Sequence, residues 1–244
     1  MHGRLVVTAV AAGLLLAGCA GRAPAAAPVK AADGSYVIDT LRARHEMGLR
    51  LRFHRNVAEL LDNTQFALAD GPAEPLTAAV VVADVVSVQR GVGFHVPGAD
   101  APRGTLIDYE DDRASWRTVH VDVAVSRVIS GASPGTVRVG FSFDASSAFD
   151  EIAAAFHAMD HLPLFLSTGS PVFDYDPSLY ALVEDGAYLG YVDADGTITL
   201  PALPADTARA MLGQTPTIDR LAAAAAGPLR LVHIDASGRG LAGG

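Results

Sequence analysis

Hydrophobic and polar residues alternate most regularly between positions 116 and 143. In the first half of this stretch every second residue from Val119 to Val125 is valine, and after a turn of small residues at 130–135 the alternation resumes. Successive side chains of a strand point to opposite faces, so this pattern predicts a half-buried β-hairpin. The phase shifts at Arg127, and such a shift predicts a β-bulge.

Shorter stretches predict further strands. Residues 78–88 are almost entirely valine and alanine, interrupted by Asp84, and a near-continuous run of this kind predicts a strand covered on both faces, with Asp84 at a bulge or an edge. A Leu- and Phe-rich run at 161–167 predicts a buried strand. Strands are also expected at 179–183, 188–193 and 197–200, the last two joined by an Asp195-Gly196 turn.

Three segments have the pattern of helices, at 57–68, 145–159 and 215–226. The second carries hydrophobic residues with helical spacing, and Ser146 or Ser147 is the expected N-cap. Residues 91–115 are expected to form a long loop, and residues 201–206 a linker. The predicted fold class is therefore mainly β (α+β), a small antiparallel β-barrel or sandwich with two or three flanking helices.

The N-terminus has the pattern of an export signal. A basic head at 1–4 precedes an apolar run of twelve residues, which is shorter than the roughly 20 residues that span a bilayer. The following Leu16-Ala17-Gly18-Cys19 resembles the lipobox of bacterial lipoproteins. This resemblance implies that Cys19 is lipidated and that the protein is anchored at the extracytoplasmic face of the cell membrane. Cys19 is the only cysteine, so no disulfide is expected within the chain.

The chain is thus expected to comprise five parts. These are a lipoprotein signal peptide (1–18), a flexible tether (19–34), a basic N-terminal segment with a helix (35–70), a β-barrel domain with helices (71–234) and a flexible tail (235–244).

Charge is unevenly distributed along the chain. The net charge is −9, but residues 41–56 contain one acid, Glu46, and five arginines: Arg42, Arg44, Arg50, Arg52 and Arg55. These arginines either contact anionic lipid headgroups or a partner, or pair with the acidic domain that follows them. Alternation of apolar residues with the arginines around 49–54 suits a strand or a docked segment. The acidic balance of the domain argues against nucleic acid as a partner.

Candidate catalytic groups are few. His157 and His161 are spaced i, i+4 with Asp160 between them, which resembles the H-x-x-E-H motif of inverted zinc proteases except that Asp replaces Glu. His120 on the polar phase of its strand is a candidate base. The acidic residues between 108 and 112 could hold calcium, but they lack the ligand spacing and turn glycine of a calcium loop, so a solvated loop is the default interpretation. No dinucleotide or phosphate-binding motif is present, and no cofactor is expected.

The exported part also resembles a group of uncharacterised lipoproteins and secreted domains from GC-rich bacteria. The matching pieces are Val80–Val88, Val121–Val139, Leu162–Leu166, Tyr180–Ile198 and the helix that begins at Thr217. The resemblance implies a small OB-like or netrin-like β-barrel and no particular activity.

The leading hypothesis is a non-catalytic binding or adaptor module of the cell envelope that presents loops 91–115 and 168–178 to an envelope protein or a small ligand. One alternative is a metal-dependent hydrolase that uses His157 and His161. Another is a structural protein that attaches to the envelope through the arginines of segment 42–55.

Overall fold

The computed structural model describes residues 33–46, 56–68, 72–97, 104–168, 170 and 172–234. All of them belong to one compact unit, Ala32–Gly244. The export signal, Cys19, most of the predicted tether, the tail at 235–244 and the arginines Arg50, Arg52 and Arg55 lie outside the described residues. Within the described part, no helix has the length and apolar character needed to cross a membrane.

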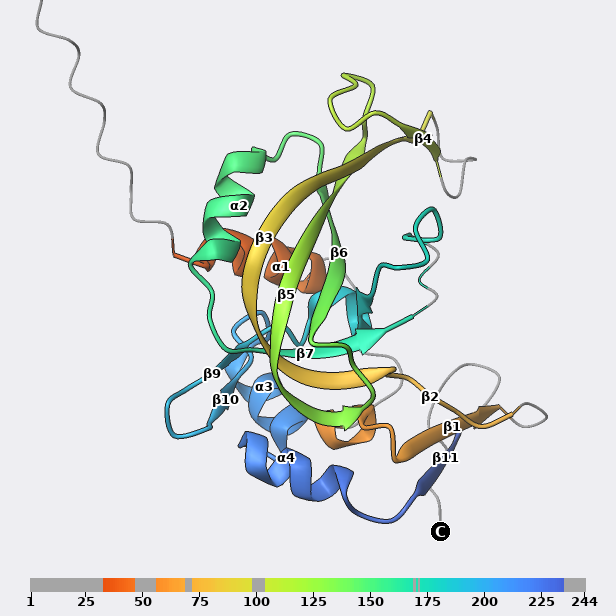
Figure 1. Ribbon diagram of the computed structural model, residues 1–244, viewed down its shortest axis with the longest axis vertical. Coiled ribbons are helices and arrows are strands. Elements are labelled where there is room, and N and C mark those ends of the chain that lie inside the picture. The colour runs from red at the N-terminus through yellow and green to blue at the C-terminus, as the bar shows by residue number, and fades with distance from the viewer. Residues whose placement is uncertain are drawn as a thin grey trace, which may run out of the picture. The chain divides into compact units, whose positions relative to one another are not determined.

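An antiparallel sheet forms the centre of the molecule (Figure 1). Its strands follow the order β6-β5-β3-β7-β8, and β4 pairs with the far end of β3. The bounds are β3 Ala79–His95, β4 Thr105–Ile107, β5 Trp116–Gly131, β6 Thr136–Asp144, β7 Leu162–Ser167 and β8 Ala181–Leu182. Together with the helices described below, this sheet confirms the predicted mainly β, α+β class with antiparallel strands.

The predicted hairpin and its bulge are both present. Strands β5 and β6 pair continuously, with Val121 opposite Val139. On its other edge β5 pairs with β3, and the register there shifts so that Ser126 has no partner between Val125 and Arg127. The Ser126 hydroxyl instead donates to the carbonyl of Val82 at 3.0 Å. The change of phase at Arg127 therefore marks a bulge, which also bends the strand.

Strand β3 separates two hydrophobic cores. Its first five residues, 79–83, are buried on both faces, as the valine and alanine run predicts. Val81 and its neighbours on that phase belong to the main core, whereas Val80 and Val82 belong to the second one. Pairing with β7 ends at Ala83, so Asp84 lies at the edge where that ladder stops, as predicted.

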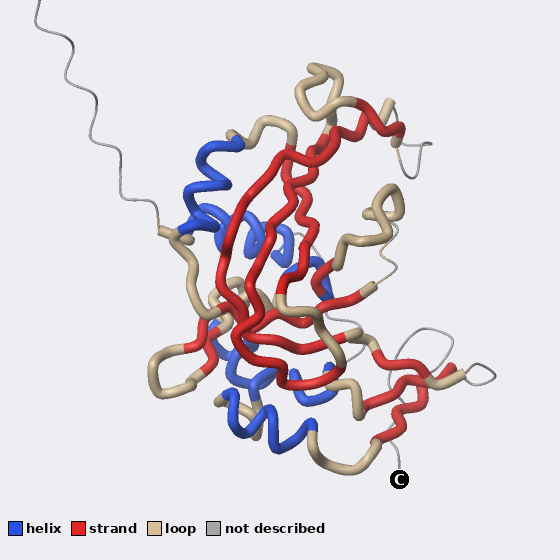
Figure 2. Tube along the Cα trace, in the orientation of Figure 1, coloured by secondary structure: helices blue, strands red, loops and turns tan. Residues whose placement is uncertain are grey.

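The two ends of the sheet approach each other at a single residue. The Tyr180 amide donates to the Arg138 carbonyl at 2.9 Å, and the Gly140 amide donates to the Tyr180 carbonyl at 2.8 Å. This is a parallel bridge between Tyr180 and Val139. The described strands do not extend it into a ladder, so the expected closed barrel is not formed and the sheet is strongly curved instead (Figure 2).

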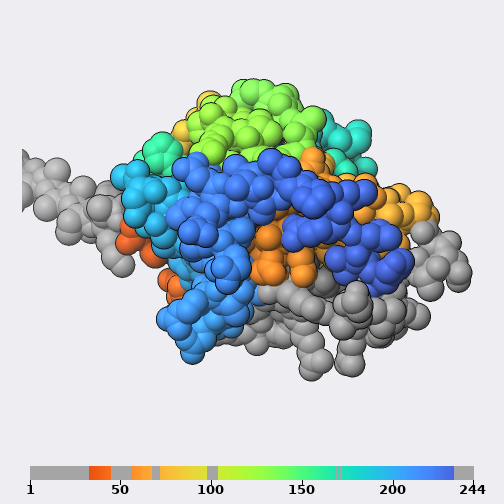
Figure 3. Space-filling model, turned by 90° about the horizontal axis from the view of Figure 1, so that it is seen from below, coloured from red at the N-terminus to blue at the C-terminus, as the bar shows by residue number. Residues whose placement is uncertain are grey.

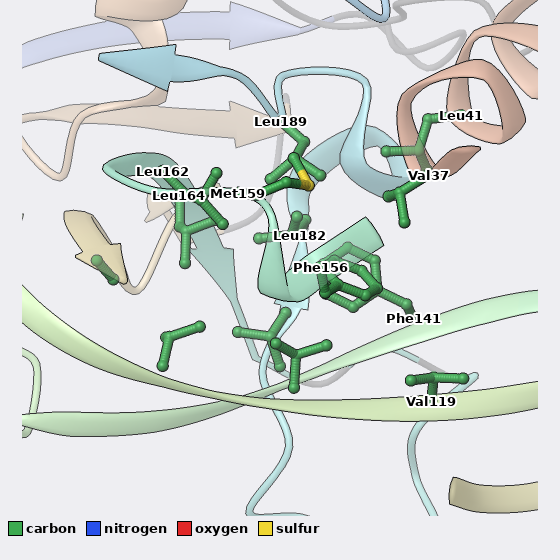
Figure 4. Packing of buried hydrophobic residues seen from close by; sticks show 14 of the residues in the cluster. Val37, Leu41, Val119, Phe141, Phe156, Met159, Leu162, Leu164, Leu182 and Leu189 are labelled. Atoms are coloured by element: carbon green, nitrogen blue, oxygen red, sulfur yellow. The ribbon is translucent and has the colours of Figure 1, made fainter. Parts of the chain in front are cut away.

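The main core lies between this sheet and two helices, α1 Ser35–Glu46 and α2 Phe149–His157. Phe156 of α2 packs on Phe141 of β6 with ring centroids 4.7 Å apart, and both lie in the core view of Figure 4. Met159 follows the helix and is fully buried, as its hydrophobic spacing predicts. The apolar face of α1, which includes Val37 and Leu41, completes this core (Figure 4).

The second core lies on the other side of β3 and is covered by shorter elements, among them α4, which belongs to the blue surface in Figure 3. The elements outside the main sheet are η1 Val57–Leu60, η2 Val183–Gly186, α3 Ala205–Leu212, α4 Ile218–Ala225, the hairpin β9 Tyr191–Val192 and β10 Ile198–Thr199, and the small sheet of β1 Thr64–Leu68, β2 Glu74–Pro75 and β11 Arg230–Ile234. Thr217 caps α4 by accepting from the Arg220 amide, and Gly196 takes a left-handed conformation in the β9–β10 turn.

The prediction of a helix at 57–68 is wrong. A single 3-10 turn, η1, is followed by a break and then by strand β1. The break occurs because the polar residues in the middle bond to distant segments. The Asp62 carboxylate accepts from the Gly131 amide at 2.9 Å, and the Asn63 side chain donates to the Ala224 carbonyl at 2.8 Å.

Three smaller expectations also need correction. Helix α2 begins at Phe149, and Ala148 is its N-cap because Ser146 bonds to Asp144 instead. The expected loop at 91–115 is shorter, since β3 continues to His95 and β4 pairs with it. The linker expected at 201–206 runs into helix α3, which packs in the second core through Met211.

Candidate functional site

The two histidines of the candidate zinc motif do not share a helix face. Helix α2 ends at His157, and His161 lies beyond it with a positive φ of 51°. The ring of His161 faces Asp84, with 3.0 Å between His161 Nδ1 and Asp84 Oδ1. Among the residues that the structure describes, no group of three or more His, Cys, Asp or Glu side chains is placed to hold a metal ion. The geometric premise of the zinc motif is therefore wrong.

The two described arginines of the basic segment bond within the domain. Arg42 donates to the Pro201 carbonyl at 2.7 Å. Arg44 forms an ion pair with Asp185 at 3.0 Å and donates to the hydroxyl and the carbonyl of Ser142. Both side chains therefore contact the domain, as one of the two alternatives predicts.

Two carboxylates of the acidic segment 108–112 form ion pairs with arginines. Glu110 pairs with Arg90 at 3.0 Å, and Asp111 pairs with Arg113 at 2.7 Å. Arg90 also lies over the Phe149 ring, 4.1 Å from its centroid, and so ties this segment to α2. These contacts give two of the carboxylates a structural role.

A further candidate surface lies on the outward face of β5 and β6. The polar side chains that alternate with the core valines gather there: Thr118, His120 and Asp122 on β5, with Arg138 and Gly140 on β6. We call these five residues the β5–β6 face. The segment 172–179 folds across it, and we call this segment the strap. In Figure 1 the strap lies beside β6, on the other side of the sheet from α2.

Aromatic rings line the strap and one end of this face. Phe173 is 6% exposed and packs directly on Gly140, where an added Cβ would meet the Phe173 ring at 2.7 Å. Tyr175 lies 6.0 Å from Phe94 and 6.5 Å from Phe173, measured between ring centroids. Phe94 stacks in turn on Trp116 at 3.8 Å, with the two planes only 4° apart. A glycine on the polar phase of a strand commonly marks such a close approach.

A hydrogen-bonded group joins the strap to the sheet. The Tyr175 hydroxyl donates to Thr118 Oγ1 at 2.9 Å and lies 2.8 Å from His120 Nε2. Thr118 is fully buried, and its hydroxyl also accepts from the Val92 amide at 2.8 Å. His120 packs closely over β3, since a Cβ on Gly91 would meet its ring at 2.6 Å. The polar groups beneath the strap are therefore satisfied, as buried polar groups generally must be.

An ion pair forms the next part of the face. Arg138 binds Asp122 through two nitrogens, at 2.6 and 3.1 Å, and Ser87 and Gln89 of β3 also donate to this carboxylate. The hydrogen bonds from Arg138 lower the pKa of Asp122, so the carboxylate is ionised at neutral pH. The Arg138 side chain remains 39% exposed. A guanidinium held in this way presents its outer edge to an anionic group.

Burial tunes the titrating groups of the site. It lowers the pKa of His120, and the nearby Arg138 guanidinium lowers it further, which keeps the imidazole neutral at pH 7. Burial also raises the pKa of Tyr175, against the opposing effect of the bond to Thr118. At neutral pH the face therefore presents a neutral imidazole, which can accept a hydrogen bond, beside a protonated phenol, which can donate one.

Comparison of the chain with protein family models, with curated proteins and with solved structures found no match. The site must therefore be interpreted from its own geometry.

Sequence reasoning located only part of this site. His120 was a candidate base on an exposed face, and the structure instead places it half-buried beneath Tyr175. The strap overlaps the loop at 168–178 that we expected to be presented for binding. The roles of Tyr175, Phe173 and Gly140 were missed. The available signals were two aromatic residues in a turn rich in Ser, Pro and Asp, and a glycine on the polar phase of β6.

Proposed function

We propose that the protein is a lipid-anchored, extracytoplasmic binding module of the bacterial cell envelope, whose ligand face is the β5–β6 face beneath the strap. The observation that carries this proposal is the combination of two aromatic rings of the sheet and two of the strap with a neutral imidazole and a partly exposed arginine. Aromatic and arginine side chains are the residue types that dominate binding surfaces.

We further propose an OB-like architecture for the domain. Its supports are the strand order, the position of α2 between β6 and β7, and the parallel bridge between Tyr180 and Val139, which brings the two ends of the sheet together. In OB folds the second and third strands and the two loops beside them bind extended ligands. In this chain the corresponding elements are β5, β6, the segment between β3 and β5, and the strap.

Membrane attachment is proposed from the N-terminal sequence alone. A lipobox ending at Cys19 would place an acyl group, such as palmitate, at the start of the mature chain. Replacement of Cys19 by serine should release the protein from the membrane fraction and abolish incorporation of labelled palmitate. Retention of the Cys19→Ser chain in membranes would contradict the anchor and leave the binding face to be tested separately.

Trp116 provides the test of the binding face. It is the only tryptophan in the chain, and its ring stacks on Phe94 at one end of the site. The full chain, held in mild detergent, is titrated with separated protein, glycan and lipid fractions of a cell envelope while Trp116 emission is recorded. The proposal expects one fraction to give a saturable change that is reduced in an Arg138→Gln variant. A change of equal size in wild type and variant, or none with any fraction, would refute it.

A further inference from the structure

We propose that the strap occupies the place of the ligand, and that the ligand is an acidic, turn-forming peptide segment of a partner protein that carries two aromatic residues separated by one position. This inference rests on the proposed function, because it names the ligand class of the same face. The strap itself has this composition, with Phe173-Asp174-Tyr175-Asp176 at its centre.

The first argument is the fit of the aromatic residues. The Phe173 ring occupies the space that the missing side chain of Gly140 leaves on β6. The Tyr175 hydroxyl reaches Thr118 and His120, while its ring faces Phe94. Each aromatic residue therefore has its own receiving position on the sheet, and residue 174 between them is exposed. The strap reaches both positions from a turn, in which the Asp176 amide donates to the Phe173 carbonyl at 3.1 Å, so a peptide with the same turn would fit them.

The second argument is charge complementarity. Asp176 is close enough to Arg138 and His120 for these groups to act on one another electrostatically, and the carboxylate favours the protonated forms of both. The Arg138 side chain is also partly open to solvent. A peptide with an acidic residue directly after its second aromatic residue would place a carboxylate where Asp176 lies. An uncharged or basic peptide would lack this interaction.

The third argument is that the strap has hydrogen bonds of its own. The amides of Asp176 and Leu179 donate within the strap, at 3.1 Å each, and Ser178 donates to the Asp176 carboxylate. Among the described hydrogen bonds, those from the strap to the face come from the Tyr175 hydroxyl. The backbone bridge to β6 begins only at Tyr180. These internal bonds would hold the strap together if it left the face, and the bridge at Tyr180, directly after the strap, would then be loosened.

The test uses a labelled peptide with the sequence of residues 172–178, VFDYDPS, and the full chain in mild detergent. Fluorescence anisotropy compares the wild type with a Phe173→Ala/Tyr175→Ala variant, in which the internal competitor is weakened. Binding competence is limited by the fraction of molecules with an open face, so the double variant should bind the peptide about tenfold more tightly than the wild type. Leu106→Ala, at an exposed position of β4, is the control and should bind as the wild type does.

Two further comparisons make the result specific. A peptide with both aromatic residues replaced by alanine should not bind, and adding Arg138→Gln to the double variant should weaken binding. The near-UV circular dichroism of Trp116 checks that the double variant is folded. If it is not, Tyr175→Phe takes its place, because it removes the bonds of the strap to Thr118 and His120 and leaves both receiving positions unchanged.

Equal affinity of the wild type and the open variant, or binding that does not depend on the aromatic residues, would overturn the inference. If the peptide does not bind but an envelope fraction still changes Trp116 emission in an Arg138-dependent way, the ligand class is wrong and the proposed binding face stands. If neither ligand acts through Arg138, both proposals fail.

Discussion

Replacement of Tyr175 by phenylalanine removes the hydroxyl that bonds the strap to Thr118 and His120. The ring keeps its packing against Phe94 and Phe173, so the change is confined to the contacts with Thr118 at 2.9 Å and His120 at 2.8 Å. Each intramolecular hydrogen bond contributes about 0.5–1.5 kcal/mol net to stability. We therefore expect closure of the strap to become less favourable by about 1–2 kcal/mol, since the site is partly solvated.

Amide hydrogen exchange measures this change where it occurs. The amides of Gly140 and Tyr180 form the bridge at the end of the strap, and local openings expose such amides without global unfolding. A loss of 1–2 kcal/mol corresponds to exchange about 5- to 30-fold faster. The amide of Val121, in the centre of β5, should be unaffected, because its exchange requires opening of the main core.

A second Tyr→Phe variant shows whether the loss of any tyrosine hydroxyl would have the same effect. Tyr191 is also half-buried but belongs to β9, so Tyr191→Phe should leave exchange at Tyr180 unchanged. If Tyr175→Phe leaves the Gly140 and Tyr180 amides at the wild-type rate, the hydroxyl does not hold the strap and the reasoning is refuted. If Val121 accelerates as much as Tyr180, the strap does not open separately from the core.

Three other predictions follow from the same contacts. The folded state lowers the pKa of His120, so the stability linked to this group is fully present above its unfolded pKa of about 6.5. This stability is lost as the pH falls from about 6.5 towards the lowered pKa of the folded state. Urea unfolding at several pH values should show this loss, and His120→Gln should reduce it. Arg44→Ala removes the contacts with Asp185 and Ser142 and should lower the free energy of unfolding by about 1–2 kcal/mol, more than Arg209→Ala on the exposed side of α3. The full chain purified without a metal-affinity tag should contain far less than one zinc per molecule. If the chain instead contains about one zinc per molecule, and the His157→Ala variant does not, the result would support the hydrolase alternative.

Local patterns predicted the parts of the fold that depend on neighbouring residues. The alternation in 116–143 gave the hairpin because one face of it is buried, and the change of phase located the bulge near Arg127. The Thr217 cap and the turn at Gly196 were also predictable, since each depends on residues within a few positions. The run at 79–83 was covered on both faces because two cores meet there.

The remaining parts depend on contacts between distant residues. Segment 57–68 had helical spacing, yet Asp62 and Asn63 bond to residues that lie 69 and 161 positions away, and these bonds divide the segment. The candidate site is similar, because Thr118 and Tyr175 are 57 positions apart and meet only when the strap folds across β5. The zinc motif depended on a helix as well. Residues spaced i, i+4 lie on one face only within a helix, and α2 ends at His157.

Site-specific photo-crosslinking in living cells would test the binding face most directly. A photoreactive amino acid is placed at Ser178, which is exposed on the strap, and in a control at Asp206, which is exposed on α3. The account predicts a discrete crosslinked product from position 178 that is absent from position 206 and weakened by Arg138→Gln. The same products from both positions, or products from position 206 alone, would contradict the assignment of the β5–β6 face as the ligand site.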